Sequence, residues 1–161
     1  MSAPGHSLVL LWNRLAPLPG GRKLFAWFLG RRVPYSGTIA PRVVSLEPGR
    51  ARIEISDRRR VRNHLQSIHA IALANLGELT SGLAMTTALR RDVRGIVVSL
   101  RMEYTKKARG TLTAEAHCDV PDVTGDTQYD AIATIRDEAG DVVARAVVTW
   151  KLGTARSENR V

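Results

Sequence analysis

The sequence is poor in cysteine and in long apolar runs. Cys118 is the single cysteine among 161 residues, so no disulfide can form within one chain and nothing requires an oxidising compartment. Cys118 lies in a stretch, residues 113–118, in which apolar and polar residues alternate. This pattern predicts a half-buried strand residue rather than a nucleophile. No apolar run approaches the roughly 18 to 20 residues that cross a bilayer, and no basic segment precedes the early run at residues 8–12 as in a signal peptide. A cytoplasmic location is the default expectation.

Acidic residues are scarce in the first part of the chain. Residues 1–62 hold 12 Lys/Arg and 3 Asp/Glu, a balance of +9, whereas residues 63–161 hold 12 of each. This asymmetry favours a polyanionic partner for the N-terminal part: nucleic acid, an anionic membrane surface or a phosphorylated ligand. Four of the eight aromatics lie in the first 30 residues, on apolar helical stretches. Because they do not alternate with Lys/Arg on strands, they form no stacking platform, and we expect no nucleic-acid partner.

The pattern along the chain predicts two short helices followed by an α+β domain. The helices are expected at residues 7–16, with Ser7 as cap and Pro17 as stop, and at residues 21–31. With the boundary at Pro34, residues 1–35 form a helical extension. We predict strands at residues 38–46 and 51–56, a long helix at 67–89, and strands at 95–106, 111–120, 128–137 and 142–152.

Two strands, one helix and four strands in a meander are typical of the hotdog fold. In that fold an antiparallel sheet wraps around one long central helix, which buries its apolar surface against the sheet. The expected hotdog domain covers residues 36–153, and a disordered polar tail covers 154–161. Gly77 and Gly82 weaken the helix by roughly 1 kcal/mol each relative to Ala, which indicates close packing against a neighbouring surface.

The segment that enters the long helix carries the candidate chemistry. Asn63 and His69 bracket the entry loop, and Glu78 follows His69 by nine positions. With the strand at 98–100 and the turn at 107–110, these features resemble the hotdog-fold acyl-CoA thioesterases of the phenylacetate-degradation type, and an uncharacterised branch of that superfamily more closely. The resemblance covers roughly residues 36–152 and leaves the N-terminal helices outside.

This resemblance implies a thioesterase whose substrate is an acyl-CoA or related thioester. A helix N-terminus can hold a developing oxyanion, so the backbone N–H groups of His69, Ala70 and Ile71 are the expected donors, and Asn63 can add a further hydrogen bond. Glu78 is the expected general base or nucleophile, and Ser99 is expected to orient water or the carboxylate. Arg91, Lys107 and Arg109 are the expected contacts for the CoA phosphates. We expect no cofactor and no metal, because His64 and His117 lack metal-ligand spacing.

The spacing of His69 and Glu78 predicts a shared site. Nine helical residues span about 13.5 Å and two and a half turns, so the two side chains point to opposite sides of one helix. A two-fold dimer with antiparallel helices brings Asn63 and His69 of one protomer to Glu78 of the other, and the resemblance implies the same arrangement. A tetramer built from such dimers stays open.

Several alternatives stay open at this level. His69 is followed by Ala70 and Ile71 where the thioesterases have Gly-Gly, and Glu78 stands where many have Asp, which favours a non-catalytic acyl-CoA or fatty-acyl binding protein as the second hypothesis. A hydratase is less favoured, because Asn63 cannot accept a proton as a carboxylate does. Each candidate also has a structural interpretation: Glu78 as a surface residue, His69 as a helix-end residue, Asn63 as a turn residue. The extension either packs on the main domain, covers an acyl chain as a lid, or contacts an anionic membrane.

Overall fold

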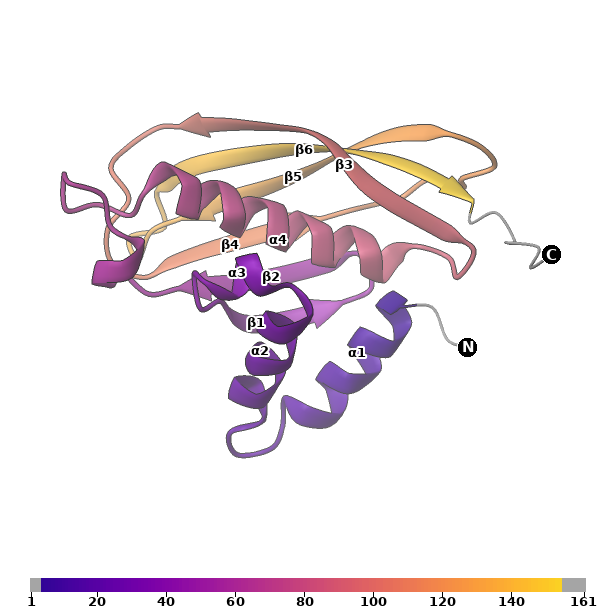
Figure 1. Cartoon of the computed structure of the whole chain (residues 1–161), viewed down its shortest axis with the longest axis horizontal. Coiled ribbons are helices and arrows are strands. Elements are labelled where there is room, and N and C mark those ends of the chain that lie inside the picture. Colours follow the sequence, from indigo (N-terminus) through magenta and orange to yellow (C-terminus); the bar gives the residue numbers. More distant parts are fainter. Residues whose placement is uncertain (1–3, 155–161) are drawn as a thin grey trace.

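The computed structural model describes residues 4–154 and confirms the α+β hotdog fold. Figure 1 shows the curved sheet lying over the long helix α4, with the α1–α2 hairpin projecting away from the sheet. The elements are α1 (Pro4–Leu15), α2 (Gly21–Arg32), α3 (Pro34–Gly37), β1 (Arg42–Glu47), β2 (Arg50–Ile55), the 3-10 turn η1 (Arg59–Val61), α4 (Ala70–Ala88), β3 (Val93–Tyr104), β4 (Leu112–His117), β5 (Thr127–Arg136) and β6 (Val142–Thr154).

The strand order corrects the expected four-strand meander. The sheet runs β1-β2-β4-β5-β6-β3 with every pair antiparallel, so β3 pairs with β6 and β4 returns to β2. The burial of each strand explains this order. Leu112, Ala114 and Ala116 of β4 are buried and need the cover of α4, whereas β3 is exposed at most positions and suits an edge.

The glycines of α4 confirm the predicted close packing. A Cβ added at Gly77 would lie 2.4 Å from the Cβ of Ala146 in β6, so only glycine lets the helix approach the sheet at this point. A Cβ added at Gly82 would lie 3.2 Å from the indole of Trp150. Two turns of α4 therefore pack directly against β6.

The N-terminal helices pack on this body. Trp12 of α1 and Phe25 of α2 are buried and meet edge to face with ring centroids 5.2 Å apart. A Cβ added at Gly5 would lie 2.0 Å from the carbonyl oxygen of Thr86, so α1 lies directly against the last turn of α4. Since α1 already begins at Pro4, Ser7 lies inside the helix and does not cap it, contrary to the prediction.

Other boundaries also differ from the prediction. The short helix α3 was not predicted, and β1 begins at Arg42 rather than at residue 38. Strand β4 ends at His117, so Cys118 follows the strand, and β6 extends to Thr154, the first residue of the expected tail. The rest of that tail, residues 155–161, lies outside the described residues. Among residues 4–154, no helix is both long and apolar enough to cross a bilayer.

Candidate functional site

The loop that enters α4 is organised by the side chain of Asn63. Its Oδ1 accepts hydrogen bonds from Leu65 N at 2.9 Å and from both N and Oγ of Ser67 at 3.2 Å. These bonds hold a tight loop in which Gln66 adopts a left-handed φ of 55°. Three donors on Oδ1 also fix the orientation of the amide. Its Nδ2 has no acceptor among the described residues, so Asn63 combines the predicted turn role with a donor that is free for a ligand.

The first turn of α4 offers one free backbone donor rather than three. His69 is the N-cap, and its Nδ1 accepts from Ile71 N at 3.1 Å. The backbone N–H of His69 donates to Val61 O at 2.7 Å. Within residues 4–154, only the Ala70 N–H of the three expected donors has no acceptor. The expected oxyanion role can therefore fall on Ala70, while His69 holds the helix end in place.

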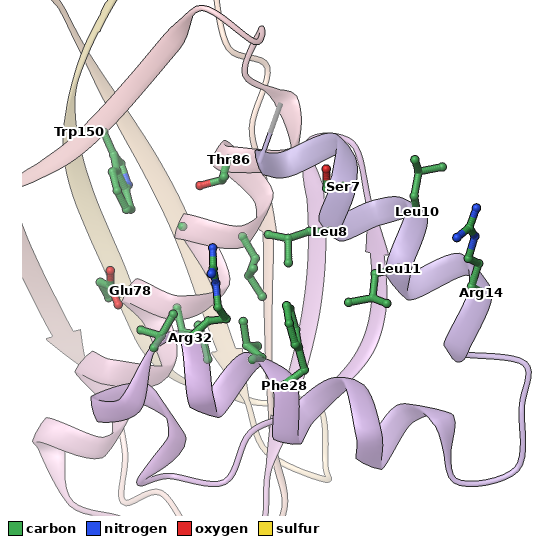
Figure 2. A pocket seen from close by; sticks show the side chains of 15 residues that line it. Ser7, Leu8, Leu10, Leu11, Arg14, Phe28, Arg32, Glu78, Thr86 and Trp150 are labelled. Atoms are coloured by element: carbon green, nitrogen blue, oxygen red, sulfur yellow. The ribbon is translucent and has the colours of Figure 1, made fainter. Parts of the chain in front are cut away.

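Glu78 lies on the wall of a pocket of about 840 Å³ between α1, α2 and α4. In Figure 2, Glu78 and Trp150 lie on one side of this pocket, Leu8 and Leu11 lie on the other, and Arg32 lies between them. The remaining lining is mostly apolar and comes from Ser7, Leu10, Arg14, Phe28, Leu29, Val33, Leu79, Gly82, Leu83 and Thr86. A volume of this size is in the range of small-molecule pockets.

Two polar groups of this pocket are left without partners. Burial raises the pKa of Glu78 above its ordinary value of 4.5, and no hydrogen bond or ion pair reaches its carboxyl group from the described residues. Trp150 also lines the pocket, and its buried Nε1 has no acceptor within residues 4–154. Buried polar groups are nearly always hydrogen-bonded, so an unpartnered carboxyl and indole N–H in one apolar pocket mark a place for the polar part of a ligand.

The structure keeps the two halves of the predicted site apart within one chain. Asn63 and His69 are absent from the lining of the Glu78 pocket, and Glu78 follows His69 by nine positions along α4. Ser99 also lies elsewhere. It pairs with Thr149, whose neighbours Val148 and Trp150 are the buried ones facing α4, so Ser99 points to the outer face of the sheet.

The alternation of β3 beyond a β-bulge agrees with the placement of Ser99 on the outer face. The register of β3 shifts between Val97 and Ser99, and from Ser99 to Tyr104 the pairing with β6 is regular. Beyond the bulge, Met102 and Tyr104 lie on the α4 side: the Met102 Sδ is near Gly77, and the Tyr104 Oη donates to Ala70 O at 3.1 Å. Within one protomer, Ser99 therefore does not reach the Glu78 carboxyl group.

The three predicted phosphate contacts are exposed and carry no ion pair within the described part of the chain. By contrast, their neighbour Lys106 is held by Asp137 and Asp141 at 2.7 Å. Lys107 and Arg109 flank Ala108, whose carbonyl accepts from Ile68 N at 2.8 Å, so both lie beside the entry loop of α4. Arg91 follows the opposite end of α4, about 28 Å away along the helix.

Sequence reasoning missed Trp150, Arg14 and Arg32 as lining residues of the Glu78 pocket. The sequence of α2 did contain an indication of this pocket. The helix carries apolar side chains on more than one face, although packing against a single neighbour requires only one apolar face. Cys118 is fully buried, not half-buried, and burial raises the pKa of its thiol to about 11, which leaves it protonated and unreactive.

Solved structures share this fold. A structural-genomics protein is 28% identical, with a TM-score of 0.82 over 94% of this chain and 99% of its own. A Pseudomonas aeruginosa protein described as a probable thioesterase is 24% identical, with a TM-score of 0.73 over 85% of this chain and 97% of its own. A Haemophilus influenzae thioesterase is 12% identical, with a TM-score of 0.66 over 78% of this chain and 87% of its own.

No curated protein matches the sequence. One protein family does: a domain of unknown function, DUF4442, matches residues 21–152, from the start of α2 to two residues before the end of β6. This range covers most of the chain and includes the entry loop, α4 and nearly the whole sheet. The chain is therefore a member of the DUF4442 family, with the hotdog fold that thioesterase-family proteins share.

Proposed function

We propose that the protein is a thioesterase that hydrolyses an acyl-CoA or a related acyl thioester at a site shared by two protomers. The main support is the unpartnered Glu78 carboxyl group on the wall of an apolar pocket of about 840 Å³. Such a pocket suits an apolar acyl chain, and a carboxyl group with a raised pKa is a stronger base than an exposed one. The description of two relatives with this fold as thioesterases agrees with this proposal.

The proposed reaction needs one base and one oxyanion donor. The Glu78 carboxylate takes a proton from a water molecule, whose oxygen attacks the thioester carbon. The carbonyl oxygen becomes an oxyanion, which the Ala70 N–H and the Asn63 Nδ2 stabilise. When this intermediate collapses, the C–S bond breaks and the thiolate takes the proton from Glu78. Direct attack by Glu78 on the thioester carbon, followed by hydrolysis of the resulting anhydride, uses the same residues.

A second protomer completes this site in the proposal. β3 is an edge strand of 12 residues, and it exposes Ile96, Val98 and Leu100 along an edge to which no described strand pairs. Long apolar edges of this kind are usually covered by another chain. A two-fold contact along β3 sets the α4 helices antiparallel, so Asn63 and Ala70 of one protomer can meet Glu78 of the other.

The same two-fold contact supports the assignment of the CoA contacts. Lys107 and Arg109 lie at the N-terminal end of α4 and Arg91 follows its C-terminal end, so antiparallel helices bring Arg91 of one protomer towards Lys107 of the other. Guanidinium and ammonium groups without internal ion pairs are suited to bind phosphate.

The second candidate function is acyl-CoA binding without hydrolysis. The observation that favours it is the first turn of α4, where the backbone N–H groups of His69 and Ile71 are already bonded. The side chain of Ile71 is 56% exposed at the place where a thioester would approach the helix end. Such a site holds a ligand well but stabilises an oxyanion with fewer donors.

A free-thiol assay over a panel of acyl-CoA substrates separates the two functions. Hydrolysis is expected for at least one acyl chain, and Glu78→Gln is expected to lower kcat by about 100-fold or more. Glu115→Gln on the exposed outer face of the sheet is the matched control and should leave kcat unchanged. Calorimetric binding of acyl-CoA with no release of thiol above the Glu78→Gln background would select the binding protein instead.

A further inference from the structure

The N-terminal helices expose an apolar and basic surface that the proposed catalysis does not use. The N-terminal patch, as we name it, consists of Leu18, Arg22, Lys23, Leu24, Trp27, Arg31 and Tyr35. Its four apolar side chains are between 51% and 66% exposed, and Trp27 alone is 60% exposed. Large aromatic and leucine side chains gathered on one exposed surface are uncommon on a soluble domain and mark an interaction site.

The two faces of α2 show that this exposure is not a by-product of packing. Phe25 and Leu29 are buried against the body, at 0% and 3% exposure, and they satisfy the contact of the helix with the domain. Leu24 and Trp27 lie on a different face of the same helix and point to solvent. Two large apolar side chains that the fold does not require indicate a partner outside this protomer.

The charges of the patch identify the kind of partner. Residues 1–35 contain five Lys/Arg and no Asp/Glu. A hollow of about 640 Å³ between α2, α3 and residues 38–42 is lined by Arg22, Lys23 and Arg31, and by Arg42, whose guanidinium pairs with Glu54. The Arg31 guanidinium lies 5.3 Å from the centre of the Trp27 ring, so cation and aromatic face solvent together. Basic side chains around exposed Trp and Leu are the signature of a helix that lies on an anionic membrane surface.

We propose that the N-terminal patch docks the protein on an anionic lipid bilayer, with the axis of α2 parallel to the membrane surface. Leu24 and Trp27 enter the boundary between headgroups and acyl chains, and Lys23, Arg22 and Arg31 bind lipid phosphates. The same two helices line the Glu78 pocket through Leu11 and Phe28, so docking brings that pocket to a source of acyl chains. The docking itself is independent of the proposed hydrolysis.

A second copy of the chain is a poorer partner for this surface. Two such patches facing one another would bring their cations together with no carboxylate to offset them. The patch also lies on the side of the molecule where α2 packs on β1, whereas the open strand β3 lies at the other edge of the sheet (Figure 1). The patch therefore stays free when two protomers join along β3.

Vesicle binding of the full chain tests the proposal. The protein is expected to co-sediment with vesicles of equimolar phosphatidylcholine and phosphatidylglycerol, and not with pure phosphatidylcholine. Binding should weaken steeply with added salt, because the Debye length falls from about 10 Å at 0.1 M to about 3 Å at 1 M. Trp12 and Trp150 are buried, so a blue shift of tryptophan emission on binding should come from Trp27 and vanish in Trp27→Phe.

Matched variants separate the patch from the rest of the surface. Leu24→Ser is expected to weaken binding about tenfold, whereas Ile132→Ser, at the same 51% exposure on the outer face of the sheet, should not. Lys23→Glu should also weaken it about tenfold, and Arg145→Glu, which changes the net charge equally, much less. The proposal would be overturned by any of three results. These are equal binding to both vesicle types, an equal loss of binding in a patch variant and its control, and self-association through the patch in the absence of vesicles. Binding to duplex DNA that Lys23→Glu abolishes and Leu24→Ser leaves intact would also overturn it.

Discussion

At the scale of the single residue, Glu78 carries the main prediction. Burial raises its pKa, so the folded protein favours the protonated form more than the unfolded chain does. The stabilising effect of that protonated form is complete below the unfolded pKa and is lost as the pH rises through the folded pKa. Glu78→Gln keeps the neutral form at every pH. Denaturant unfolding at a series of pH values should therefore show the variant gaining stability over the wild type as the pH rises above 4.5.

The activity of the wild type should rise with pH, whereas its stability relative to Glu78→Gln falls. The base is the carboxylate, so kcat of the wild type should rise as the pH passes the raised pKa of Glu78 and then level off. An equal stability difference between wild type and Glu78→Gln at all pH values would show that Glu78 is as hydrated as a surface carboxylate. That result would remove the main support for its catalytic role.

At the scale of the element, the contact of α1 with α4 gives a second prediction. An added methyl group at Gly5 meets the backbone carbonyl of Thr86 and forces α1 away, whereas nothing lies within 4 Å of a Cβ added at Gly125. Gly5→Ala should lower the free energy of unfolding by about 1 to 3 kcal/mol, and Tm by roughly 2 to 4 °C for each kcal/mol. Gly125→Ala should leave both close to the wild-type values. Because α1 lines the Glu78 pocket, Gly5→Ala should also raise KM for long acyl chains more than for short ones. Equal Tm and KM in the two variants would contradict this packing.

The elements also show which parts of the fold can be predicted from the sequence. The two glycines of α4 predicted the close contact between helix and sheet that the structure confirms. The same local patterns could not place β3, because strand order depends on which strands α4 must cover and not on the spacing within any one of them. The expected oxyanion donors show the same limit. Which N–H groups near His69 stay free depends on the distant Val61 carbonyl, and the Glu78 pocket depends on helices far from it in sequence.

At the scale of the whole molecule, the proposed shared site predicts rescue between two inactive variants. Asn63→Asp keeps the Oδ1 acceptor that holds the entry loop but loses the Nδ2 donor, so it should fold and hydrolyse poorly. Glu78→Gln removes the base. In a mixed dimer of the two, one site contains both substitutions and the other contains neither, since each site takes Asn63 from one protomer and Glu78 from its partner.

Random reassociation of equal amounts of the two variants makes half of the dimers mixed, and each mixed dimer has one intact site. Thiol release should therefore recover to about a quarter of the wild-type rate, while each variant alone stays near background. The matched control mixes Glu78→Gln with the Asn63→Asp/Glu78→Gln double variant, in which no intact site can form. A mixture that shows only the mean of the two single variants would place Asn63 and Glu78 outside any shared site. Helix α4 separates these residues within one protomer, so hydrolysis that needs both depends on a second chain.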